Sequence, residues 1–268
     1  MTALIQMFSY HFMQRALIVG VLVSLCAALL GVSLVLKRYS MIGDGLSHVG
    51  FGALAVASPL NLAPLAVAVP VVVLAAILLL RLRQSAAVKG DAAIAMISSS
   101  ALAIGVISLS LSTGMNTEVS SYLFGSVLSL SRGDAVFSVL LSLAVIALFA
   151  LFYPRIFAVT FDESFSRATG TKTELFNTLL AVLTAITVVL GMRMMGALLI
   201  SSLIIFPALS AMRICRSFKV VVLTAVCISV LCFLTGLLAS YFLETPTGAS
   251  IVVADLLAYG ICRLAGRK

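Results

Sequence analysis

The sequence has very little charge for its length. Only 10% of its 268 residues are Asp, Glu, Lys or Arg, whereas 62% are hydrophobic, and the mean hydropathy is +1.25. A water-soluble domain of this size needs a far larger polar surface, so the composition excludes one. The apolar runs are continuous over about 18 to 22 residues rather than alternating in polarity, which predicts membrane-spanning helices. We therefore expect an all-α integral membrane protein.

Motifs of enzymes and of nucleic-acid-binding proteins are also missing. No Walker-type Gly-x4-Gly-Lys-Ser/Thr element occurs, so this chain cannot supply a nucleotide site of that kind. Its only histidines are His11, which we expect at the surface, and His48; no Ser–His–Asp arrangement indicates hydrolysis, so we expect no enzyme. The net charge is +8, but no basic run with interleaved aromatic residues occurs, so we expect no nucleic-acid partner. The five cysteines form no CxxC pair, which predicts small buried hydrophobic residues.

The cationic residues gather at the ends of the apolar runs, which predicts both the helices and their orientation. We expect a single domain, residues 1–268, with eight or nine membrane-spanning helices. They cover about 15–36, 41–57, 62–80, 91–111, 134–152, 175–192 and 194–212, then one that ends near 241, and a last apolar run. Basic residues in cytoplasmic loops follow the positive-inside rule. This rule places the C-terminus in the cytoplasm and the N-terminus outside.

Four features between or within these helices stand out. The apolar segment 122–130 is too short to span a bilayer, which predicts an interfacial or re-entrant helix. The longest polar interval, about 153–174, belongs in the cytoplasm, whereas the turn at 244–248 belongs outside. Pro207 lies inside the expected helix 194–212 and should kink it.

The most unusual stretch lies between the first two apolar runs, at residues 37–48. Asp44 and His48 are four residues apart, so a helix places them one turn apart on one face, and Met41 falls on the same stripe. Ionisable side chains are rare in a membrane because an unpaired charge there costs a few kcal/mol or more. The pair therefore predicts a polar site that faces the bundle interior or a water-filled path. Four nearby glycines let neighbouring helices approach closely; they are Gly43, Gly45, Gly50 and Gly52.

From the residues alone, two interpretations of this pair stay open. A carboxylate with an imidazole suits first-row divalent metal ions, and Met41 could add a soft ligand. Alternatively, Asp44 and His48 form a buried hydrogen-bonded pair near the helix start, and Met41 serves only packing.

Four segments in order resemble the permease subunits of binding-protein-dependent ABC importers for manganese, zinc or iron. The first is Gly-Asp-Gly-Leu-Ser-His at 43–48. The second is Phe-Asp-Glu-Ser-Phe-Ser-Arg-Ala-Thr-Gly at 161–170. The third is Gly-Ala-Leu-Leu-Ile at 196–200 with Phe-Pro-Ala at 206–208. The fourth has Gly236, Ser240 and Glu244 before Pro-Thr-Gly, with glutamate where the family commonly has aspartate.

The resemblance implies a fold and a set of partners. The implied fold is the all-helical type of the vitamin B12 and siderophore importers. The implied partners are a second copy of the chain, two cytoplasmic ABC ATPase subunits that hydrolyse ATP, and an extracytoplasmic metal-binding protein. The implied location is the bacterial cytoplasmic membrane, with several passes through the lipid bilayer.

The resemblance also implies roles for particular residues. The implied metal pathway comprises Asp44, His48, Met41, Ser240 and Glu244. Glu244 has an alternative role as a solvated outer acid that attracts cations or docks the binding protein. The implied segment for coupling to the ATPase comprises Phe161, Asp162, Glu163, Phe165, Arg167 and Gly170, with the two phenylalanines one turn apart on one face.

We therefore predict the permease subunit of an ABC importer for a divalent transition metal, Zn²⁺ or Mn²⁺, with zinc slightly favoured and no permanently bound cofactor. One alternative is an ABC permease for a metal chelate of the siderophore or cobalamin type. A second is a secondary transporter that uses Asp44 and His48 as a proton relay. A third is a scaffold subunit without a pathway.

Overall fold

The computed structural model describes residues 10–60, 62–84, 90–111, 125 and 131–266. All regular structure in these residues is helical, which confirms the predicted class. The helices are α2 (His11–Leu36), α3 (Ser40–Ala57), α4 (Pro64–Gln84), α5 (Gly90–Ser110), α7 (Arg132–Leu151), α8 (Tyr153–Phe161), α9 (Glu163–Ala168), α10 (Thr173–Met195), α11 (Ala197–Ile214), α12 (Phe218–Leu243) and α13 (Thr247–Ala265).

Seven of these helices are long and apolar enough to cross a membrane, namely α2, α4, α5, α7, α10, α12 and α13. Helix α11 contains a shorter apolar stretch, Leu199–Ile214, and α3 carries the polar pair. With these two helices in the same bundle, the predicted count of eight or nine is compatible with the structure. The chain is a multi-pass membrane protein.

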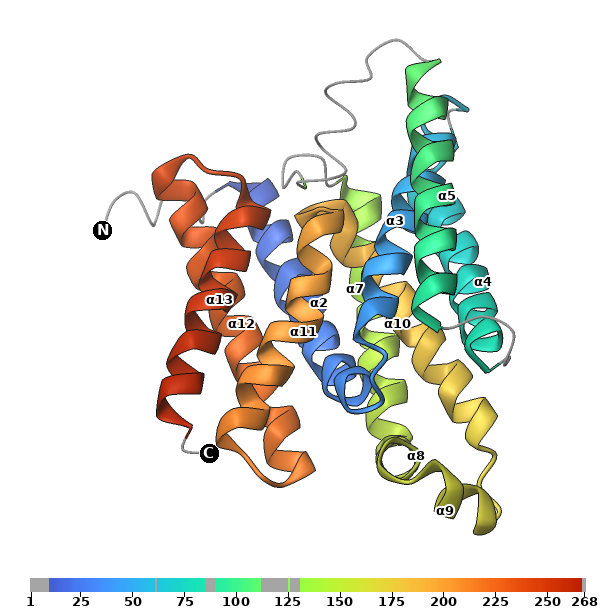
Figure 1. Cartoon of the computed structure of the whole chain (residues 1–268). Helices are drawn as coiled ribbons and strands as arrows, with labels where there is room; N and C mark the ends of the chain where they lie inside the picture. The colour runs from blue at the N-terminus through green and yellow to red at the C-terminus, as the bar shows by residue number, and fades with distance from the viewer. Residues whose placement is uncertain (1–9, 61, 85–89, 112–124, 126–130, 267–268) are drawn as a thin grey trace.

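The long helices alternate in direction, as Figure 1 shows. The ends of α2 and α13 and the short helices α8 and α9 lie at the lower end of the view, and the turn between α12 and α13 lies at the upper end. The lower end carries most of the cationic residues, so we call it the cytoplasmic end. The first described residues of α2 lie at the opposite end, in agreement with the predicted orientation.

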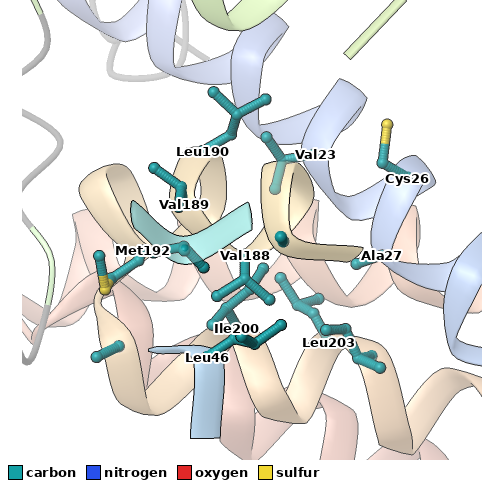
Figure 2. Close-up of a cluster of buried hydrophobic side chains, with 14 of the residues drawn as sticks. Val23, Cys26, Ala27, Leu46, Val188, Val189, Leu190, Met192, Ile200 and Leu203 are labelled. Atoms are coloured by element: carbon teal, nitrogen blue, oxygen red, sulfur yellow. The ribbon is translucent and has the colours of Figure 1, made fainter. Parts of the chain in front are cut away.

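The centre of the bundle is built from α2, α10, α11 and the inner face of α3. Figure 2 shows side chains from all four helices in one buried cluster, including Val23, Leu46, Val188 and Ile200. In lipid such contacts stabilise the fold through close packing, because the solvent is as apolar as the side chains. Leu46 is fully buried, and it fixes which side of α3 faces the core.

The predicted close approach at the glycines of α3 is confirmed. A Cβ atom at Gly52 would lie 2.6 Å from the carbonyl oxygen of Ala101 in α5. A larger residue therefore cannot occupy this position without pushing α5 away from α3. These two helices form the walls of the site described below.

Several predicted bounds differ from the structure. Helix α2 begins at His11 rather than near 15, and α4 continues beyond 80 to Gln84. The predicted polar interval 153–174 contains two short helices, α8 and α9. Helix α11 continues past Pro207 to Ile214, and the kink at this proline stays a prediction. The predicted interfacial helix 122–130 lies outside the described residues, apart from residue 125.

Candidate functional site

The orientation of α3 determines where its polar pair points. Leu46 lies two positions from both Asp44 and His48, and two residues turn a helix by about 200°. Because Leu46 packs into the core, the two polar side chains point away from it. Asp44 and His48 are partly exposed as a result, at 40% and 23% of their side-chain surface.

Asp44 and His48 lie close together, and Asp44 has a further polar contact. His48 Nε2 is 3.8 Å from Asp44 Oδ2. The hydroxyl of Ser201 in α11 donates a hydrogen bond of 3.2 Å to the other carboxylate oxygen, Oδ1. His48 Nδ1 is buried and has no hydrogen-bond partner among the described residues.

The pair faces a cavity of about 430 Å³ between α3 and α5. From α3, Met41 joins Asp44 and His48 in the lining, as the predicted stripe requires. The α5 wall consists of Asp91, Ile94, Ala95, Ser98, Ser99 and Leu102. Two carboxylates, an imidazole and two hydroxyls therefore line one cavity, and its volume is sufficient for an ion with bound water.

The donor atoms of this cavity suit a loosely held divalent ion. Within the part of the chain that the structure describes, no three His, Cys, Asp or Glu side chains converge closely enough to hold a metal ion. Asp44 and His48 would supply at most two protein ligands of this kind, and zinc sites generally have four ligands. Water molecules or residues of another chain would have to complete the shell.

Ser240 and Glu244 lie at the other end of the bundle from α8 and α9 (Figure 1). Ser240 donates a hydrogen bond of 2.6 Å to the carbonyl oxygen of Thr245, which closes the turn between α12 and α13. Glu244 is exposed and has a left-handed backbone, with φ of 53°. The spacing of Ser240 and Glu244 in the fourth motif predicts one shared helical face, and this prediction is wrong, because α12 ends at Leu243. No described contact joins this turn to Asp44.

The predicted coupling residues lie in α8, α9 and the turn that follows. Asp162 has an extended backbone and caps α9, because its Oδ1 accepts a 2.8 Å hydrogen bond from the Phe165 amide. The two phenylalanines therefore belong to different helices, which corrects the single face predicted for them. Phe161 packs against the ring of Phe218 but is still 59% exposed, and Phe165 is 65% exposed. Gly170 follows α9 with φ of 84°, a conformation that favours glycine.

Several polar residues in the structure are absent from the predicted site. Ser201 contacts Asp44 from α11, and Asp91 lines the same cavity from α5. Ser201 follows the 196–200 motif directly, but nothing in its sequence context indicates which carboxylate it meets. Two further charged groups are also absent from the predicted site: Arg193, which lies between two predicted spans, and Asp255, which lies inside the last apolar run. Arg193 forms an ion pair of 3.1 Å with Asp134, and Asp255 is fully buried.

The comparisons with known proteins agree with this architecture. Residues 9–264 match the model of the ABC 3 transport family. The high-affinity zinc uptake system membrane protein ZnuB of Haemophilus influenzae is 29% identical over 244 residues, which cover 91% of this chain and 94% of that protein. The manganese import system permease protein ScaB of Streptococcus gordonii is 27% identical over 250 residues, with 93% and 90% covered.

The fold is also that of a solved transporter chain. One chain of PsaBC from Streptococcus pneumoniae, determined in complex with a Fab, matches with a TM-score of 0.88 and 28% identity. The match covers 98% of this chain and 95% of that one. These findings confirm the resemblance drawn from the four sequence motifs. The chain belongs to the ABC 3 transport family.

Proposed function

We propose that this chain is the membrane permease subunit of an ABC importer that moves a divalent transition metal ion, zinc or manganese, into the cytoplasm. The observation that carries this proposal is the Asp44–His48 pair, which faces a cavity of about 430 Å³ between α3 and α5. Relatives named for zinc and for manganese support the class of substrate. Zinc is slightly favoured, because an imidazole ligand suits zinc better than manganese.

The proposed cycle begins outside the cell. An extracytoplasmic binding protein delivers the ion to the outer end of a permease dimer. The ion then exchanges part of its water for the Asp44 carboxylate and His48 Nε2. A site with only two protein ligands holds the ion weakly. Weak binding favours release, which a transport site requires.

A separate pair of ATPase subunits powers the cycle. The exposed surface of α9, with Phe165 at its centre, is the proposed contact with the ATPase. A second copy of this chain would face the first and complete the cavity wall. Closure of the ATPase subunits around ATP would move α9 and tilt the helices, which releases the ion to the cytoplasm.

Metal uptake in cells tests the proposal. Cells that lack their own importer receive the permease, its ATPase and its binding protein, and uptake of zinc, manganese and iron is measured. We expect His48→Ala and Asp44→Asn to abolish uptake while assembly with the ATPase persists. The matched control is His11→Ala, which removes the other histidine from an exposed position at the start of α2 and should transport normally.

Each rival function predicts a different result. A chelate permease takes up a siderophore or cobalamin, and its uptake does not depend on Asp44 or His48 as direct ligands. A secondary transporter moves ions without the ATPase. A scaffold subunit tolerates Asp44→Asn. Any one of these results would overturn the proposed function.

A further inference from the structure

We infer that Lys37 fastens the cytoplasmic helix α9 to α2, α8 and α10, and that it is a positioning residue for the coupling of ATP hydrolysis to metal movement. The first part rests on geometry alone, whereas the second part rests on the proposed function. Lys37 follows the last residue of α2 directly. Its side chain is only 5% exposed, which is unusual for a lysine at the end of a membrane helix.

The Lys37 ammonium has one hydrogen-bond acceptor for each of its three donors. Nζ donates to the carbonyl oxygen of Val159 at 3.0 Å, to Glu163 Oε2 at 3.2 Å and to Asn177 Oδ1 at 2.6 Å. These acceptors belong to α8, α9 and α10, respectively. A lysine has three donors and no acceptor, so this one is fully satisfied by three different helices. A lysine exposed at the surface would instead donate its hydrogen bonds to water.

The acceptors of Lys37 are also bonded to each other. Asn177 Nδ2 donates to Glu163 Oε1 at 3.2 Å, so the glutamate uses both of its oxygens within the cluster. Burial lowers the pKa of Lys37, although the Glu163 carboxylate opposes that shift. Burial raises the pKa of Glu163, but hydrogen bonds from Asn177 and Lys37 outweigh it, so the pKa is lowered overall and the carboxylate stays charged. The cluster is therefore a hydrogen-bonded network in which the Lys37 ammonium is paired with a charged carboxylate.

Helix α9 has few other means of attachment. Ser164, Phe165, Arg167 and Ala168 are all exposed, and Ser166 is its one buried side chain. Arg167 also approaches Glu163, at 3.5 Å, but it belongs to α9 itself and cannot tie that helix to the bundle. The Lys37 network is thus a polar link between α9 and the membrane-spanning helices.

The position of Lys37 in the chain gives this link its significance. The connection from α2 to α3 comprises only three residues, Lys37–Tyr39, and Asp44 follows one turn after the start of α3. A force that moves α9 therefore acts on the same short connection that holds the metal-facing helix. Without Lys37, α9 could move with the ATPase while α2 and α3 stay in place.

Lys37→Met tests both parts of the inference in the assembled transporter, with its ATPase and binding protein, in proteoliposomes. The matched control is Lys219→Met, which removes an exposed lysine from the cytoplasmic end of α12. Amide hydrogen exchange reports how firmly α9 is held, because local opening controls the exchange of its amides. Transported zinc per hydrolysed ATP reports the coupling.

We expect the amides of residues 163–168 to exchange about tenfold faster or more in Lys37→Met, since a hydrogen-bonded charge is lost, while those of α12 stay unchanged. The zinc transported per ATP should fall by a similar factor, although ATP hydrolysis and assembly persist. Lys219→Met should leave both readouts unchanged. If Lys37→Met does not fold, Asn177→Ala replaces it in the test. This variant removes a single neutral partner of Lys37, so it should act in the same direction with a smaller effect.

Unchanged protection of α9 in Lys37→Met would overturn the fastening role. Faster exchange with an unchanged ratio of zinc to ATP would overturn the positioning role. If the wild-type complex moves no metal at all, the proposed function fails, but the exchange measurement still decides whether Lys37 holds α9.

Discussion

Asp44 uses its two carboxylate oxygens differently. Oδ2 faces His48, whereas Oδ1 accepts a hydrogen bond from Ser201. A hydrogen bond from outside the ligand set orients a carboxylate and tunes its affinity for metal. Ser201 therefore serves the site without lining its cavity.

This role predicts the effect of Ser201→Ala. We expect a roughly tenfold rise in the metal concentration for half-maximal uptake, with the maximal rate largely retained, because the carboxylate loses its orientation but remains present. The measurement is the uptake rate as a function of metal concentration. Ser98→Ala is the control, because Ser98 lines the cavity but bonds to the Ile94 carbonyl of its own helix. An equal effect of both substitutions would contradict the orienting role.

The polar residues differ in how far the sequence predicts their contacts. The spacing of Asp44 and His48 was sufficient to predict a shared face, because one helix determines it. Ser201 is 157 positions from Asp44, and its partner depends on how α11 packs against α3. In the sequence, the buried Lys37 looks like any other cation at the cytoplasmic end of a membrane helix, because the positive-inside rule explains every such cation equally well.

Among the helices, the close contact of α3 with α5 determines the shape of the cavity. Gly52→Ala should destabilise the permease by about 1–3 kcal/mol, because its Cβ would meet the Ala101 carbonyl oxygen at 2.6 Å. Thermal unfolding of the detergent-solubilised protein measures this as a lower midpoint. The control is Gly260→Ala in α13, where a Cβ meets nothing within 4 Å. This control should be neutral or stabilising by up to about 1 kcal/mol. Equal midpoints for both variants would contradict the close packing.

The attachment of α9 should depend on pH. The pKa of Glu163 is lower in the folded chain than its ordinary value. Its contribution to stability is therefore present above the ordinary value and is lost as the pH falls through the folded one. We expect amide exchange in α9, corrected for intrinsic rates, to accelerate as the pH falls below about 4.5. Glu163→Gln should exchange faster at neutral pH and lose this dependence, whereas an unaltered profile in this variant would refute the assignment.

The helices themselves were largely predictable, but their partners were not. Long apolar runs with basic ends predict where spans lie, since the bilayer fixes their length. The split of the 153–174 interval into two helices depends on the Asp162 cap and on the packing of Phe161 against Phe218. The cap is a local signal that could have been found, whereas the ring contact joins segments far apart in the chain.

Across the whole molecule, the acidic side chains Glu244 and Asp44 lie in separate places. Glu244 lies exposed at the outer turn and Asp44 faces the cavity, with no described contact between them. If Glu244 attracts cations through space, its effect must be screened by salt, because the Debye length falls from about 10 Å at 0.1 M to about 3 Å at 1 M.

Glu244→Gln should therefore slow the initial uptake a few-fold at low ionic strength, and the difference should vanish at high ionic strength. Asp44→Asn should abolish uptake at every salt concentration, because it removes a proposed direct ligand. Initial rates in proteoliposomes over a series of salt concentrations distinguish the two variants. A salt-independent loss in Glu244→Gln would instead assign this residue to the pathway itself.

The overall architecture followed from the sequence because composition selects membrane helices and four ordered motifs indicate the family. The cavity could not be predicted from the sequence, because hydropathy carries no information about which helices lie side by side. The arrangement of α3 beside α5, which brings Asp91 toward the polar pair, is visible only in the structure.

Diffraction from the assembled transporter with bound zinc, recorded on both sides of the zinc absorption edge, tests the central claim most directly. We expect an anomalous peak in the cavity between α3 and α5, about 2.0–2.2 Å from an Asp44 carboxylate oxygen and from His48 Nε2. Asp44→Asn should lose this peak. A complex that transports zinc, with every anomalous peak away from α3, would contradict the assignment of Asp44 and His48 as metal ligands.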